Sequence, residues 1–97
     1  MDLGLSDRIV FVAGASRGLG RAAALELVQE GAQVALCSRD EDRITAAADA
    51  ICDEADVDPH RVLPLVCDVT DEEAVQSAID ETVDTFGGLH VLVTNAG

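Results

Sequence analysis

The sequence contains no tyrosine, no tryptophan and no lysine, and its 97 residues include only two phenylalanines. Without tyrosine or lysine, no mechanism that needs a tyrosine acid or a lysine partner can operate within this chain. All six basic residues are arginines, and they face 19 carboxylates, which gives a net charge of −13. A field of this sign repels phosphate backbones and anionic lipid headgroups. We therefore expect neither nucleic-acid binding nor membrane-surface binding.

Long apolar runs and cysteine pairs are also missing. The apolar runs have the length of strands, as in residues 9–13, well short of the roughly 18 residues of a membrane span. Residues 1–4 lack the basic and apolar segments of a secretory signal. Three widely spaced cysteines (Cys37, Cys52 and Cys67) form no CxxC pair. We expect reduced core thiols in a cytoplasmic protein, with no disulfide and no metal site.

The absence of lysine beside so many acids has two interpretations. A dense carboxylate surface without lysine resembles proteins from salt-loving organisms, in which it holds water and ions at high salt. A GC-rich genome that favours arginine codons would produce the same absence. Both interpretations concern the environment of the protein and not its activity.

Apolar patterning predicts an alternation of strands and helices. The expected elements are strands at residues 8–13, 33–37, 62–67 and 90–94, helices at 21–30, 40–55 and 70–86, a glycine-rich turn at 14–20 and a polar loop at 56–60. Thr70 and Glu73 fit a capping box at the start of the third helix. Pro64 indicates an edge strand, because proline cannot complete a hydrogen-bond ladder.

Four strands separated by three helices imply parallel pairing with right-handed crossovers. The expected fold is α/β, with a doubly wound parallel sheet in the strand order 3-2-1-4. The first two helices should cover one face of the sheet and the third helix the other. Residues 1–97 would form a single domain, or the N-terminal part of one.

The most informative segment is the glycine-rich turn between the first strand and the first helix. Its spacing is G-x-x-x-G-x-G over residues 14–20. Gly14 permits a sharp turn, Gly18 lets the backbone approach a pyrophosphate, and Gly20 lets the helix pack on the sheet. The helix N-terminus then offers free N–H groups to phosphates. Glycine turns of this kind also occur without a ligand, but the strand before it and the helix after it favour phosphate binding.

With these motifs in this order, the chain resembles the short-chain dehydrogenase/reductase family, whose fold is of the Rossmann type. Besides the glycine loop, the resemblance rests on Ser38-Arg39 after the second strand, on Cys67-Asp68-Val69 after the third, and on Asn95-Ala96-Gly97 after the fourth. It covers all 97 residues. Two positions depart from the family pattern: Ala13 stands where the family often has threonine, and Thr94 where it often has asparagine.

The resemblance implies a cofactor site for a nicotinamide dinucleotide. Its residues would be Gly14, Ser16, Arg17, Gly18, Leu19, Gly20, Ser38, Arg39, Asp68, Val69, Asn95, Ala96 and Gly97. Within it, the Asp68 carboxylate would accept from the adenine amino group and the Val69 N–H would serve a ring nitrogen. The alternative role for Asp68 is to cap the following helix.

The residue after the second strand favours NADP over NAD. NAD-binding units of this kind place an acid near that position, about 20 residues beyond the glycines, to hold the ribose 2′-hydroxyl. Here Ser38 replaces the acid, and Arg39 follows with a guanidinium suited to a 2′-phosphate. Arg17 in the glycine loop can reach the same phosphate. The alternative for Arg39 is a surface ion pair with Asp40 or Asp42.

In the resembled family, a serine and a Tyr-x-x-x-Lys pair further along the chain carry the chemistry. No catalytic residue is therefore assigned here, and we expect an inactive cofactor-binding fragment. The parent would be an NADP-dependent oxidoreductase acting on a carbonyl or alcohol, with 3-oxoacyl-carrier-protein reductase as one candidate type and a homo-oligomer as its expected state. Two alternatives stay open: a non-catalytic nucleotide-binding or sensor module, and a methyltransferase, which Ser38-Arg39 and residues 95–97 disfavour.

Overall fold

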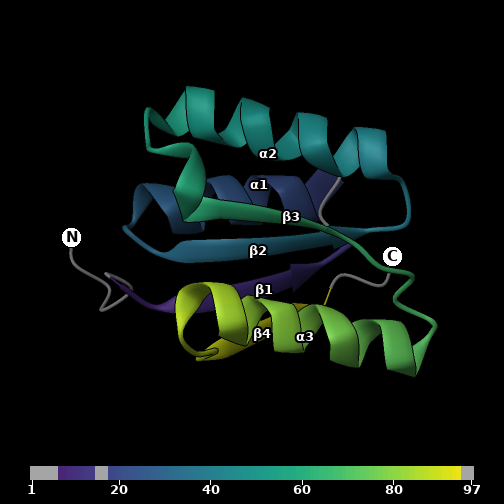
Figure 1. Ribbon diagram of the computed structural model, residues 1–97. Coiled ribbons are helices and arrows are strands. Elements are labelled where there is room, and N and C mark those ends of the chain that lie inside the picture. Colours follow the sequence, from purple (N-terminus) through teal and green to yellow (C-terminus); the bar gives the residue numbers. More distant parts are fainter. Residues whose placement is uncertain (1–6, 15–17, 95–97) are drawn as a thin grey trace.

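The structure is a computed structural model that describes residues 7–14 and 18–94. Strands and helices alternate within these residues, as expected (Figure 1). The elements are β1 (Ile9–Ala13), α1 (Gly18–Gln29), β2 (Gln33–Ser38), α2 (Glu41–Ala55), the 3₁₀-helix η1 (Pro59–Arg61), β3 (Val62–Val66), α3 (Glu72–Phe86) and β4 (Val91–Thr94). No described helix is long and apolar enough to cross a membrane.

The four strands form one parallel sheet in the order β3-β2-β1-β4, which confirms the predicted topology. In the central pairings, Val10 lies opposite Val34 on one side and Val91 on the other. β3 pairs with β2 alone, so Pro64 lies on an edge strand as its missing N–H requires.

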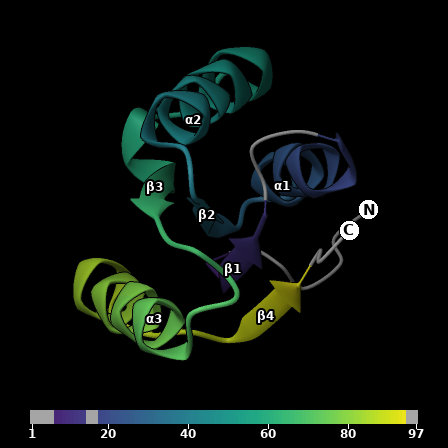
Figure 2. The ribbon, with the colours of Figure 1, turned by 90° about the vertical axis from the view of Figure 1, so that its right-hand side faces the viewer.

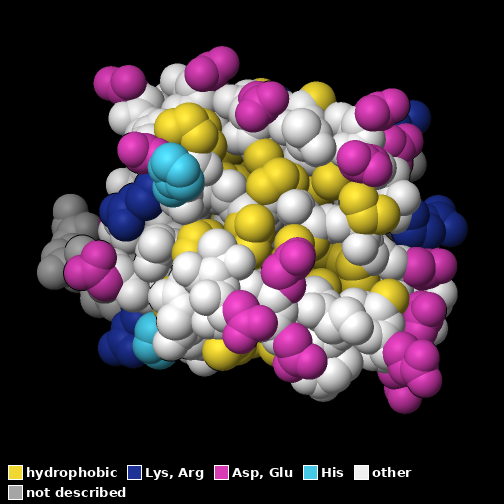
Figure 3. Space-filling view, viewed as in Figure 1, with side chains coloured by type: hydrophobic (Ala, Val, Ile, Leu, Met, Phe, Trp, Pro, Cys, Tyr) yellow, Lys and Arg dark blue, Asp and Glu magenta, His cyan; other side chains and the backbone are white. Residues whose placement is uncertain are grey.

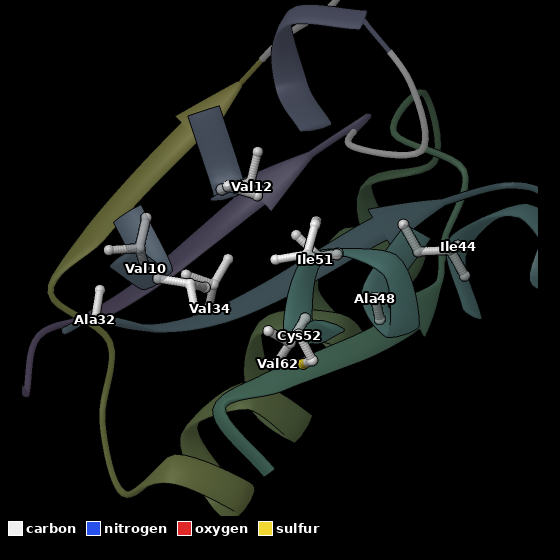
Figure 4. Packing of buried hydrophobic residues seen from close by; sticks show 12 residues of the cluster. Val10, Val12, Ala32, Val34, Ile44, Ala48, Ile51, Cys52 and Val62 are labelled. Carbon is white, nitrogen blue, oxygen red and sulfur yellow. The ribbon is translucent and has the colours of Figure 1, made fainter. Parts of the chain in front are cut away.

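Helices cover both faces of the sheet, α1 and α2 on one and α3 on the other (Figure 2). Because successive side chains of a strand point to opposite faces, β1 supplies both cores and is buried along its whole length. Val10 and Val12 pack in the cluster beneath α1 and α2, which Figure 4 shows with Ile51 of α2. Phe11 and Ala13 belong to the cluster on the α3 side.

Two helix starts differ from the sequence-based expectation. α1 begins at Gly18 and not at residue 21, so its first turn lies within the glycine motif itself. The capping box predicted at Thr70 is wrong, because the N-cap of α3 is Asp71, whose Oδ1 accepts from the N–H groups of Glu73 and Ala74. The hydroxyl of Thr70 is already committed to Asp68 and is not available to cap the helix.

Candidate functional site

Those predicted site residues that the structure describes lie at the carboxyl edge of the sheet. Because the strands are parallel, β1, β2, β3 and β4 all end at this edge, which faces the viewer in Figure 2. In doubly wound sheets, ligands bind beyond this edge, where the strand order reverses. Here the reversal lies between β1 and β4. Ser16, Arg17, Asn95, Ala96 and Gly97 lie outside the described residues, as do the contacts that they would make.

The chain turns sharply at Gly14, directly after β1. Gly14 has a φ of 74°, a left-handed conformation that favours glycine. Its N–H donates to the carbonyl oxygen of Cys37 at the end of β2, over 2.8 Å. The turn is thereby fixed to the neighbouring strand, and α1 starts only four residues later, at Gly18.

The first turn of α1 differs in charge from those of the other two helices. It carries no acidic residue, whereas α2 and α3 each begin with an aspartate N-cap followed by two acids. Carboxylates at a helix start stabilise the partial positive charge there. The chain has 19 acidic residues. Among the three described α-helices, α1 alone has no acidic residue in its first turn to neutralise the partial positive charge. Such a terminus suits a phosphate, and Gly20 is buried in this same turn.

Ser38 and Arg39 stand at the end of β2. The Ser38 carbonyl accepts from Cys67 N–H at 2.8 Å, which ties the ends of β2 and β3 together. Ser38 Oγ accepts from the Asp40 N–H at 3.3 Å, while the side chain of Arg39 is exposed. The end of β2 therefore presents a hydroxyl and a cation to this edge of the sheet.

The surface ion pair considered for Arg39 does not form among the described residues. Asp40 caps α2 and uses its carboxylate for Arg43, whose N–H lies 3.0 Å from Oδ1 and whose Nε lies 3.6 Å from Oδ2. No described carboxylate, that of Asp42 included, lies within the 4.0 Å of an ion pair with Arg39. The guanidinium of Arg39 thus remains accessible to an anion from outside the described chain.

Asp68, just beyond β3, is held by a short local network. Its Oδ1 accepts from the Thr70 hydroxyl at 2.7 Å and from the Thr70 N–H at 2.9 Å. These bonds lower the pKa of Asp68 below its ordinary value, and the nearby positive charge of Arg39 lowers it further. Asp68 is half-buried, and the neighbouring Val69 is 40% exposed. The alternative role of Asp68 as the helix cap falls to Asp71 instead.

Buried cysteines anchor the backbone under this edge. Cys37 and Cys67 are both buried, as the sequence predicted, and both are free; Cys37 Sγ donates to the Cys67 carbonyl at 3.2 Å. Burial, and next to it the neighbouring Cys67 side chain, raise the pKa of Cys37 well above its usual range. Its thiol is consequently a packing and hydrogen-bonding group and not a nucleophile. No cluster of metal ligands occurs in the described part of the chain.

Sequence reasoning missed the part that Thr70 plays at this edge. It assigned Thr70 to the start of α3, yet both bonds of Thr70 go backwards to Asp68. The available signal was the two-residue spacing between Asp68 and Thr70. An aspartate side chain often accepts from the backbone N–H two residues on, and this pattern competes with the capping box for the same threonine.

Comparisons with known proteins agree with this geometry. The family model described as short chain dehydrogenase matches residues 8–97. A curated relative, the short chain dehydrogenase tazN of Aspergillus terreus, is 44% identical over 96 residues, which cover 98% of this chain and 20% of that protein. The chain spans between 18% and 37% of the lengths of the curated relatives compared with it.

Two solved structures share the fold closely. One is L-sorbose reductase from Gluconobacter frateurii in complex with NADPH and L-sorbose. It is 36% identical with a TM-score of 0.90, and the match covers 100% of this chain and 36% of that one. The other is the NADP-bound N-domain of a bacterial malonyl-CoA reductase. It is 39% identical with a TM-score of 0.88, and the match covers 96% of this chain and 17% of that one.

The family match thus extends over nearly the whole chain, and the fold agrees with it. This chain belongs to the short-chain dehydrogenase family, and its fold is the nucleotide-binding Rossmann type.

Proposed function

We propose that residues 1–97 form the NADP(H)-binding part of a short-chain oxidoreductase that transfers hydride between the cofactor and a carbonyl or alcohol carbon. The observation that carries the preference for NADP is the pair at the end of β2. Ser38 takes the position of the acid that NAD-binding units use, and the exposed Arg39 has no described carboxylate partner. The two solved neighbours named above, which hold NADPH and NADP, support the same choice.

The residues of this chain would bind and orient the adenosine end of the cofactor. The N-terminus of α1 and the turn at Gly14 fit the pyrophosphate, because the helix start carries no acid of its own. Arg39 fits the 2′-phosphate through charge-assisted hydrogen bonds, and Asp68 fits the adenine amino group. When bound, the nicotinamide supplies the hydride chemistry. The remaining site residues of the proposal are Ser16, Arg17, Gly18, Leu19, Gly20, Val69 and residues 95–97.

The chain would not complete the reaction by itself. It has no tyrosine and no lysine, the residue types with which the resembled family protonates and activates its substrate.

We also favour part of a larger protein over a freestanding sensor module, because Val91 and Leu92 on the edge strand β4 are 41% and 51% exposed. Exposed apolar edge strands favour association with further structure. A 3-oxoacyl-carrier-protein substrate is one candidate for that parent protein.

Calorimetric titration of the 97-residue chain with NADP⁺ and NAD⁺ tests the cofactor proposal. Arg39→Ala should weaken NADP⁺ binding about tenfold or more, because a hydrogen bond to a charged group contributes roughly 1.5–3 kcal/mol. NAD⁺ binding should change little, since NAD⁺ lacks the 2′-phosphate. Arg43→Ala is the matched control: it removes another exposed arginine nearby, one already paired with Asp40, and should leave both affinities unchanged. An equal loss for both nucleotides in Arg39→Ala, or tighter binding of NAD⁺ by the wild type, contradicts the proposal.

A further inference from the structure

We propose that Thr70 is a positioning residue for adenine recognition, acting through Asp68; this inference rests on the function proposed above. Two donors of Thr70 occupy one oxygen of the carboxylate, the hydroxyl at 2.7 Å and the backbone N–H at 2.9 Å. Among the described residues no hydrogen bond engages the other oxygen, Oδ2. The network thus holds Oδ1 and leaves Oδ2 as the acceptor for an exocyclic amino group.

The backbone before Asp68 is held as firmly as the side chain. Cys67 donates its N–H to the Ser38 carbonyl at 2.8 Å and accepts from the Cys37 thiol at 3.2 Å. The backbone after Asp68 forms a turn, in which the Asp71 N–H donates to the Asp68 carbonyl at 3.0 Å. With the main chain held on both sides, the remaining freedom of Asp68 is the rotation of its side chain about the Cα–Cβ and Cβ–Cγ bonds. Thr70 removes that freedom.

The same bonds favour the ionised form of the carboxylate, which an aspartate already adopts at neutral pH. The Thr70 donors lower the pKa of Asp68, and the positive charge of Arg39 adds to the effect. An ionised carboxylate is only an acceptor of hydrogen bonds. It therefore favours adenine, whose position 6 carries an amino donor, over hypoxanthine, whose position 6 carries a carbonyl oxygen.

The ratio of the two affinities, for the adenine and the hypoxanthine nucleotide, tests the positioning role. Substitution of a threonine with a purely structural role would not change this ratio. The probes are NADP⁺ and its hypoxanthine analogue, titrated into the 97-residue chain. The wild type should prefer NADP⁺ by about tenfold, the scale of one hydrogen bond to a charged group. Thr70→Val should reduce the preference to about threefold or less, mainly by weakening NADP⁺. Thr70→Ser, which keeps the hydroxyl, should restore it.

Two further variants separate positioning from folding. Thr85→Val removes another exposed threonine, at the end of α3, and should leave the preference at its wild-type value. Asp68→Asn should abolish the preference, and adding Thr70→Val to it should have no further effect, because Thr70 acts through Asp68. Thr70→Ala provides a second truncation if the valine variant does not fold. Carbon-13 titration of the Asp68 carboxyl should show its pKa rising towards the ordinary value in either truncation.

The outcomes are distinguishable from a failure of the proposed function. If the wild type binds neither nucleotide, the proposed function and this inference both fail. If NADP⁺ binds and Arg39→Ala weakens it, while Thr70→Val keeps the tenfold preference or weakens both nucleotides equally, only the inference about Thr70 is overturned.

Discussion

Just before β4, the side chain of His90 takes the place of a backbone carbonyl in the hydrogen bonding between β4 and β1. Its Nδ1 accepts from the buried Ile9 N–H at 3.0 Å, and its own N–H donates to the Ile9 carbonyl at 2.9 Å. Nδ1 accepts this bond through its lone pair. A side chain thus satisfies a backbone donor at the opposite end of the sheet from the proposed cofactor site.

His90→Ala should lower the free energy of unfolding by about 1 kcal/mol, because the Ile9 N–H is left without its acceptor. His90→Asn should lose less, since Asn Oδ1 can take the place of Nδ1. The measurement is the denaturation midpoint in urea. His60→Ala serves as the control: the His60 side chain is 97% exposed, and its hydrogen bond with Asp58 lies at the surface, where such contacts contribute little. Equal losses in His90→Asn and His90→Ala would disprove the acceptor role.

At the scale of elements, the end of α3 depends on one backbone conformation. Gly87 has a φ of 90°, and its N–H donates to the Val83 carbonyl at 2.8 Å, which closes the helix. A Cβ atom built on Gly87 would meet no heavy atom within 4 Å. The requirement for glycine here is therefore conformational and not steric.

Gly87→Ala should destabilise the protein by about 1 kcal/mol, the cost of a left-handed conformation for a residue with a side chain. Gly88→Ala is the matched control, because a Cβ there would touch Ile9 Cδ1 at an ordinary 3.8 Å and no positive φ is involved. It should change the stability by less than about 0.5 kcal/mol. Thermal unfolding followed by circular dichroism measures both. A larger loss in Gly88→Ala than in Gly87→Ala would refute this account.

At the scale of the whole molecule, charge and apolar surface are unevenly distributed. All 19 acidic residues precede residue 85, so the segment that contains β4 carries none. The face shown in Figure 3 carries scattered acidic side chains around a central band of hydrophobic ones. The exposed Val91 and Leu92 lie in the acid-free segment. Self-repulsion of the carboxylates therefore acts on the helical layers more than on the β4 edge.

The net charge predicts a stabilising effect of salt. Raising NaCl from 0.1 to 1 M shortens the screening length from about 10 to 3 Å, which weakens repulsion among the carboxylates. The melting temperature at pH 7 should rise by several degrees. At acidic pH, where protonation reduces the net negative charge, the rise should shrink. A melting temperature that stays constant or falls with NaCl at pH 7 would rule out self-repulsion as a significant destabilising factor.

Local patterns were sufficient to predict most of the fold. Strand-length apolar runs, amphipathic helices and short connections imply parallel strands, and right-handed crossovers then leave few possible strand orders. Pro64 marked an edge strand because the missing N–H is a property of the residue itself. The glycine spacing likewise indicated the turn after β1, since only glycine adopts its positive φ at little cost.

Only the tertiary structure decided which partner each polar group takes. From the sequence, Thr70 was expected to cap α3 and Asp40 was a possible ion-pair partner of Arg39. In the structure, the Thr70 hydroxyl donates to Asp68 and Asp40 pairs with Arg43. The physical reason is that neighbouring donors and acceptors compete over distances of a few ångströms. Each of these groups has more than one possible partner within a few residues of the sequence, and the backbone conformation after β2 and β3 selects the pair that forms. The sequence by itself therefore determined the fold and the types of residue at the carboxyl edge, while tertiary packing left Arg39 accessible and held Asp68 in place.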